Sequence, residues 1–136
     1  MQIKIEKEKL RRIIFTLPVI MISSGIFWLS NQSRPPLPDL VFELNDKFLH
    51  FIAYFIFGIS ILLAVQANGK KWNQRQIIIT VIIIGFIYGI SDEIHQYYIP
   101  GRSFDFFDWI ADAAGICISL FFLKNIRKII FKNSIL

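Results

Sequence analysis

The amino-acid sequence predicts an all-α membrane protein, a bundle of four transmembrane helices with both termini in the cytoplasm. Hydrophobic residues make up 54% of the 136 residues, and the mean hydropathy is +0.53. The apolar residues gather in long uncharged runs, which is typical of membrane proteins rather than soluble domains. Four such runs follow one another, and each is close to the length of about 17–25 residues that a helix needs to cross a bilayer.

Charge and cysteine content exclude two other classes of protein. The net charge of +5 does not indicate nucleic-acid binding, because the basic residues flank the apolar runs instead of forming one patch. The only cysteine, Cys117, excludes an intrachain disulfide and a CxxC metal motif. We therefore expect the lipid bilayer, and no nucleic acid, as a partner, and the sequence contains no signal for an oligomeric state.

The first transmembrane helix is expected over residues 13–30, after a basic cytoplasmic lead at residues 1–12. Pro18 near its start is compatible with a mild kink. A cleaved signal peptide is the alternative, because basic residues precede the apolar run. The bulky residues Trp28 and Leu29 occupy the region where a cleavage site would need small residues, which favours an uncleaved anchor.

Three more helices are expected, over residues 48–68, 77–99 and 104–123, so that residues 13–123 form a single domain. A proline-containing loop at 31–46 and a basic connector at 69–75 join the first three helices. Pro100 and Gly101 end the third helix, and Ser103 is in position to cap the fourth. Residues 124–136 form a basic cytoplasmic tail.

The orientation follows from the distribution of Lys and Arg. The lead, the connector and the tail hold five, three and four of them, and the other side holds only Arg34, Lys47 and Arg102. Twelve against three follows the positive-inside rule and predicts that both termini face the cytoplasm. Aromatic residues fall near the expected interfaces, as in aromatic belts: Trp28, Trp109, Tyr97 and Tyr98 outside, and Trp72 inside.

Acidic residues interrupt the apolar sequence at one place. Residues 91–115 hold five of the ten Asp and Glu residues. Each carboxylate exposed to lipid would cost roughly 2.5–3.5 kcal/mol, and Asp92 and Asp112 should lie roughly 10–12 Å inside a core about 30 Å thick. These side chains are therefore expected to face one another or a polar cavity that opens to the outside.

Helical spacing aligns polar residues on three of the expected helices. Asp46, His50 and Tyr54 are spaced i, i+4, i+8 on the second helix, and Asp105, Asp108 and Asp112 share a face of the fourth. On the third helix one face carries Tyr88, Asp92, His95 and Gln96, with Glu93 about a quarter-turn away. Arg102, in the tight outer loop, can supply a counter-charge. The catalytic candidates are Asp92, Glu93, His95, Asp108 and Asp112. The ligand-binding candidates are Asp46, His50, Tyr54, Gln96 and Arg102.

Four interpretations of this polar group remain open. It could be a hydrolase or transferase acting on an outer-leaflet lipid headgroup, with a divalent metal held by His50, His95 and Asp112. The chain has no HExxH motif, so this interpretation depends on residues from different helices. Alternatively, the group binds an anionic or cell-wall-related ligand without catalysis, serves a small proton-coupled carrier, or only holds the helices together.

The same stretches resemble the VanZ-like family of small bacterial membrane proteins. The resemblance rests on Asp-Lys-x-x-His-x-x-x-Tyr at 46–54, Glu-x-x-Gln at 93–96, Pro-Gly-Arg at 100–102 and Asp-x-x-x-Asp-x-x-Gly at 108–115. Asp112 departs from the Asn of the founding members. The resemblance implies a protein of the bacterial cytoplasmic membrane, related to a namesake that lowers susceptibility to teicoplanin, with no established reaction. We expect it to bind a lipid-linked or glycopeptide-related envelope molecule, with modification of that molecule as an open alternative.

Overall fold

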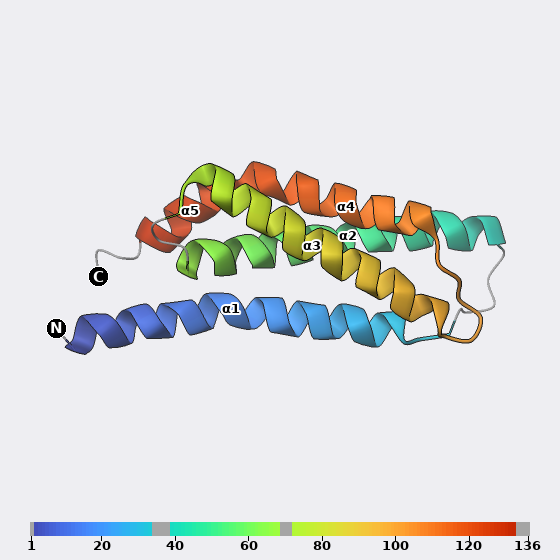
Figure 1. The fold of residues 1–136 in the computed structure, drawn as a ribbon, viewed down its shortest axis with the longest axis horizontal. Coiled ribbons are helices and arrows are strands. Elements are labelled where there is room, and N and C mark those ends of the chain that lie inside the picture. Colours follow the sequence, from blue (N-terminus) through green and yellow to red (C-terminus); the bar gives the residue numbers. More distant parts are fainter. Residues whose placement is uncertain (1, 34–38, 69–71, 133–136) are drawn as a thin grey trace.

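The computed structural model describes residues 2–33, 39–68 and 72–132, and these residues are almost entirely helical (Figure 1). The elements are α1 (Gln2–Ser30), α2 (Asp39–Asn68), α3 (Gln74–Tyr97), α4 (Phe106–Ser119), the 3-10 turn η1 (Leu120–Phe122) and α5 (Leu123–Lys132). Four segments are long and apolar enough to cross a membrane: Ile5–Ser30, Asn45–Asn68, Gln74–Tyr97 and Phe106–Ile130. The predicted all-α bundle of four membrane-spanning helices is confirmed, and the described part of the chain contains no strand.

The helices extend beyond the apolar runs. α1 begins at Gln2 and includes the basic lead, whose Lys, Glu and Arg residues are strong helix formers. α2 begins at Asp39 and takes in the second half of the predicted loop. With 30 residues it is about 45 Å long, longer than the hydrocarbon core, so its first turns reach past the apolar span. The prolines of that loop and the first three residues of the basic connector, residues 34–38 and 69–71, lie outside the described residues.

The fourth span is built from two helices. η1 separates α4 from α5, and the buried side-chain amide of Gln66 donates a hydrogen bond to the Leu123 carbonyl at this break (3.0 Å). The predicted basic tail is therefore helical as far as Lys132. Ile126 and Ile130 of α5 are buried against the bundle, while Lys124, Arg127 and Lys128 are exposed. This amphipathic pattern explains why α5 packs despite its charge.

α2 is the central helix of the bundle. It packs most extensively against α4 and also contacts α1, α3 and α5. Figure 1 shows the start of α1 and the end of α5 at the same end of the molecule, as an even number of spans requires. The loop between α3 and α4 lies at the opposite end, together with the start of α2. The side of the membrane on which each end lies stays a prediction.

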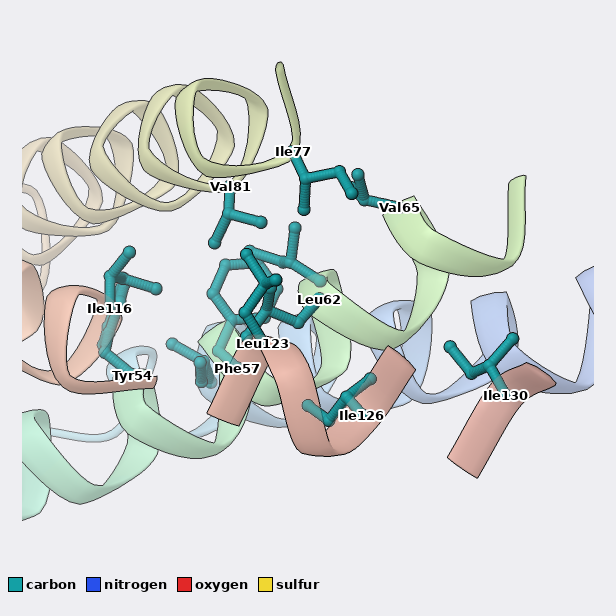
Figure 2. Packing of buried hydrophobic residues seen from close by; sticks show 12 residues of the cluster. Tyr54, Phe57, Leu62, Val65, Ile77, Val81, Ile116, Leu123, Ile126 and Ile130 are labelled. Atoms are coloured by element: carbon teal, nitrogen blue, oxygen red, sulfur yellow. The ribbon is translucent and has the colours of Figure 1, made fainter. Parts of the chain in front are cut away.

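The apolar core extends from the middle of the bundle toward the end that holds the start of α1 and the end of α5, and Figure 2 shows its packing. Tyr54, Phe57, Leu62 and Ile116 are among its most completely buried large side chains. The outward faces of the helices are also apolar, with residues such as Met21, Ile83 and Ile87 exposed. A protein that is apolar both inside and outside suits a lipid environment.

Gly115 allows α4 to approach α2 at backbone distance. A Cβ atom at this position would lie 2.5 Å from the Phe51 carbonyl oxygen and 2.7 Å from the Phe55 nitrogen. No residue with a side chain fits there without moving one of the helices. A small residue of this kind lets two membrane helices pack closely, and the contact brings the preceding turn of α4, with Asp112, against α2.

Candidate functional site

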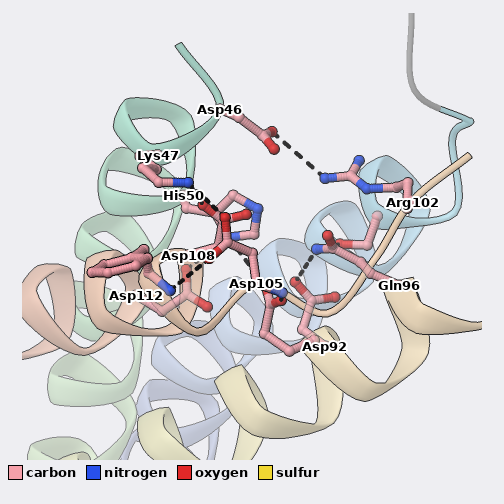
Figure 3. Close-up of polar contacts among 12 residues, drawn as sticks. Asp46, Lys47, His50, Asp92, Gln96, Arg102, Asp105, Asp108 and Asp112 are labelled. Carbon is pink, nitrogen blue, oxygen red and sulfur yellow. Dashed lines mark hydrogen bonds and ion pairs between the residues drawn. The ribbon is translucent and has the colours of Figure 1, made fainter. Parts of the chain in front are cut away.

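The polar side chains of α2, α3 and α4 meet at the loop end of the bundle (Figure 3). At the centre, His50 Nδ1 lies 2.9 Å from Asp112 Oδ1 and 3.9 Å from Glu93 Oε1. All three residues are buried, with Glu93 and Asp112 at 0% and 1% exposure. We call His50, Glu93 and Asp112 the inner triad. Helical spacing predicted polar faces that carry His50 and Asp112 and put Glu93 about a quarter-turn away from the polar face of its helix. The structure brings one residue from each of these helices together.

A second group of charges lies closer to the surface. Lys47 Nζ bridges Asp105 Oδ2 at 2.8 Å and Asp108 Oδ1 at 3.0 Å, which ties α2 to the start of α4. Arg102 Nη2 lies 3.5 Å from Asp46 Oδ1, so the expected counter-charge in the outer loop pairs with a carboxylate of α2 (Figure 3). Both cations of the group thus have acidic partners.

Asp105 lies just outside the fourth span and is the N-cap of α4. Its side chain accepts a hydrogen bond from the Phe107 amide at 2.8 Å, so the expectation that Ser103 would cap this helix was wrong. The physical reason is that the loop stays non-helical as far as Asp105, beyond the left-handed turn at Gly101. Burial alone would raise the pKa of Asp105, but the hydrogen bond from Lys47, that from Phe107 and the Lys47 charge lower it overall.

α3 contributes two more links. Gln96 Nε2 donates to Asp92 Oδ2 at 3.2 Å and lies 3.4 Å from Ser30 Oγ of α1. The second carboxylate oxygen of Glu93 accepts a hydrogen bond from the Asp105 amide at 3.0 Å. These bonds hold α3 against both the first helix and the α3–α4 loop.

Two predicted site residues lie at the edge of this arrangement. The ring of Tyr54 stacks nearly parallel to His50, with centroids 6.5 Å apart. Its buried hydroxyl has no hydrogen-bond partner of regular geometry among the described residues. His95 points to α1, where its ring stacks on Phe27 at 4.5 Å. His95 is therefore not brought together with His50, although both had been expected to bind the same metal.

Two residues of the site escaped the sequence analysis. Lys47 was not among the candidate site residues, but it lies between two carboxylates of the cluster. A signal was present, since Lys47 adjoins the Asp46–His50 face and precedes the apolar run directly. Ser30, buried at the end of α1, gave no comparable signal, because a single serine at the end of an apolar run is common.

The donor atoms form two sets that are compact enough for a metal ion. One set is the inner triad, and the other combines His50 with Asp46 and Asp108. Within each set the candidate ligand atoms lie within 4.8 Å of one another. His50 belongs to both, which makes it the central residue of the site.

Known proteins with related sequences identify the family of this chain. The profile of the VanZ/LLP1 family matches residues 5–130, nearly the whole chain. A protein of Schizosaccharomyces pombe, "Uncharacterized protein C11E3.10", is 26% identical over 83 residues, which are 61% of this chain and 49% of that protein. The match thus spans about half the length of that relative, and it shows that similar proteins are not confined to bacteria. No solved structure matches the chain. The chain is a membrane protein that belongs to the VanZ/LLP1 family.

Proposed function

We propose that this protein binds the headgroup of a lipid-linked cell-envelope molecule at the polar cluster, from the outer face of the membrane. One observation carries the proposal. Glu93 Oε1 and Asp112 Oδ2 are buried without a hydrogen-bond partner among the described residues. A network that served only helix assembly would be expected to satisfy such atoms, because an unpaired buried acceptor costs about 1–3 kcal/mol. Unsatisfied oxygens favour a group that the protein binds.

The surroundings of the cluster suit a ligand that is half polar and half apolar. Asp46, Lys47 and Asp105 are partly exposed, so they form a polar entrance above the buried inner triad. Large exposed apolar residues flank this end of the bundle: Phe48, Leu49, Tyr97, Tyr98, Phe104 and Phe107. Such side chains are favoured where lipid headgroups meet acyl chains.

The charge of the cluster restricts the kind of headgroup. Lys47 and Arg102 already pair with carboxylates, and acidic residues outnumber basic ones in the cluster. Free carboxylate oxygens accept hydrogen bonds from hydroxyl and amino groups. A headgroup of sugar or peptide character therefore fits better than one recognised through a bare phosphate.

A second candidate function is hydrolysis or group transfer on the same ligand. The observation that favours it is the hydrogen-bonded pair of His50 and Asp112, at 2.9 Å. A carboxylate that orients an imidazole is a common arrangement for general acid–base catalysis. His50 would then be the general base, and Asp112 would orient it.

The test is teicoplanin susceptibility in a susceptible bacterial host that expresses the protein. We expect the wild type to raise the inhibitory concentration several-fold, and Asp92→Asn and Asp112→Asn to return it to the level of the empty vector. Glu6→Gln, an exposed acid at the other end of α1, is the matched control and should behave as wild type. Immunoblots of the membrane fraction must show equal amounts of each variant.

Native mass spectrometry of the detergent-purified proteins supplies a second readout. Wild type and Glu6→Gln should carry a co-purified adduct with the mass of an envelope lipid, and Asp112→Asn should lack it. An unchanged phenotype together with the same adducts in every variant would contradict the proposal. Loss of the two variants from the membrane would instead support a network that serves only helix assembly.

A further inference from the structure

The inner triad has the composition of a three-ligand metal site. It offers one imidazole nitrogen and two carboxylates, from three different helices: His50 of α2, Glu93 of α3 and Asp112 of α4. Three protein ligands that leave one position open are typical of zinc sites that act on a ligand or water. A mixed set of one nitrogen and two oxygen donors suits Zn²⁺ or Mn²⁺ better than Ca²⁺ or Mg²⁺.

The distances within the triad are close to those that a metal requires. Bonds of about 2.0–2.2 Å in a tetrahedral site place ligand atoms about 3.3–3.6 Å apart. His50 Nδ1 lies 2.9 Å from one carboxylate oxygen and 3.9 Å from the other, values on either side of that range. Shifts of a fraction of an ångström would therefore bring His50 Nδ1 to the required separation from either oxygen, and all the ligand atoms of the triad lie within 4.8 Å of one another.

Burial and charge supply an independent reason for a cation here. Glu93 and Asp112 are almost completely buried, and each keeps one carboxylate oxygen without a partner among the described residues. Two buried carboxylates beside one imidazole leave negative charge in a place where it is costly. A divalent cation at the triad would neutralise that charge and give Glu93 Oε1, which has no hydrogen-bond partner among the described residues, a partner at the same time.

The alternative set of Asp46, His50 and Asp108 is less suited to a metal. Asp46 already pairs with Arg102, and Asp108 pairs with Lys47 at 3.0 Å. A metal in that set would have to compete with two resident cations. Within the inner triad the competing interactions are hydrogen bonds, one of them within the triad itself.

We propose that His50, Glu93 and Asp112 form a binding site for a divalent transition-metal ion, Zn²⁺ or Mn²⁺. His50 binds through Nδ1 in its neutral form, so metal binding replaces the hydrogen bond that joins His50 to Asp112. The fourth position is open to an oxygen of a bound headgroup or to water. The site differs from the set expected from the sequence, in which His95 stood in place of Glu93.

The metal site goes beyond the proposed function, and the test of the metal site does not require the proposed function to be correct. Metal content is measured on the purified protein, without any envelope assay. A protein that binds metal but has no envelope phenotype would contradict only the proposed function. An envelope phenotype in a protein that binds no metal would contradict only the metal site.

The experiment is equilibrium dialysis of the detergent-purified, chelator-stripped protein against Zn²⁺ or Mn²⁺, followed by elemental analysis. The protein for this experiment is purified without a histidine tag, and it carries Cys117→Ala so that the exposed thiol does not compete for the metal. We expect close to one ion per chain in the wild type, and at least tenfold weaker binding in Glu93→Gln and Asp112→Asn. His95→Gln is the matched comparison, because it removes the other histidine and should retain the metal.

A spectroscopic measurement keeps the proposal testable if the isosteric variants do not fold. The chain has two histidines, so in His95→Gln the remaining one is His50. Pulsed electron paramagnetic resonance of bound Mn²⁺ should then show coupling to one imidazole nitrogen. A folded wild type that binds neither ion would overturn the proposal, as would full binding in both isosteric variants or loss of metal in His95→Gln. Bound Mn²⁺ without nitrogen coupling would overturn it as well.

Discussion

Lys47 lies between two carboxylates at the start of α4, and one of them, on Asp108, is buried. Lys47 is partly exposed, so the hydration that it loses is modest and both acids gain a partner. The neighbouring pair of Arg102 and Asp46 is longer, at 3.5 Å, and connects a loop rather than two helices. At the scale of residues, the outer charges thus do more to hold α2 against α4 than to offer a free cation to a ligand.

Replacing Lys47 should therefore destabilise the fold. In Lys47→Gln the buried carboxylate of Asp108 loses its cation, which should lower the free energy of unfolding by about 1–3 kcal/mol. The measurement is denaturant unfolding in detergent micelles, followed by circular dichroism. Lys124→Gln, an exposed lysine at the other end of the bundle, is the control and should change stability little. Equal effects of the two changes would show that the Lys47 bridge adds nothing.

Asp105 makes the same bridge sensitive to pH. Its pKa in the folded protein is below the usual value of 3.8. Its contribution to stability is therefore complete above the pKa of the unfolded chain and is lost as the pH falls through the folded pKa. We expect the difference in melting temperature between wild type and Asp105→Asn to be largest at neutral pH and to shrink below pH 3.8. A difference that stays constant into the acid range would contradict this assignment.

α4 combines two functions that depend on its distance from α2. Gly115 sets that distance, because its Cα faces the backbone of α2 at Phe51 and Phe55. Asp112, one turn earlier, can reach His50 only while the two helices stay in this contact. At the scale of helices, the small residue and the acid three positions before it act together, one on packing and the other on the site.

Gly115→Ala should separate the helices and disturb the site. The added methyl group would need space that backbone atoms occupy, and overpacking of this kind typically costs about 1–3 kcal/mol. We expect a lower melting temperature and weaker metal binding to the inner triad. Gly25→Ala is the control: a Cβ atom there meets nothing within 4 Å, so stability should stay the same or rise by up to about 1 kcal/mol. A Gly115→Ala protein as stable as Gly25→Ala would contradict the packing argument.

At the scale of the whole molecule, the membrane explains what the sequence could predict. A bilayer demands long apolar helices and penalises stray charges, so the four spans and the meeting of acids at one end follow from hydropathy and helical spacing. The partners within the cluster do not follow from spacing, because they depend on helix rotation and close approach. The rotation and approach of the helices place Glu93 at the centre of the cluster and Lys47 between two of its acids. They also direct His95 toward α1, away from the cluster. The continuation of the fourth span into α5 was not predicted, because the basic residues of α5 indicated a polar tail although Ile126 and Ile130 are buried.

The orientation of the molecule decides which side of the membrane the cluster serves. Twelve of the fifteen Lys and Arg residues lie in the lead, the connector and the tail, which predicts cytoplasmic termini and a cluster near the outer surface. Single cysteines in a Cys117→Ala background test this in intact cells with a membrane-impermeant maleimide. Asp39→Cys, at the start of α2, should react, and Asn73→Cys, the N-cap of α3, should react only after solubilisation. The reverse pattern would move the cluster to the cytoplasmic half, where it could no longer meet an outer-leaflet headgroup, although its metal site could remain.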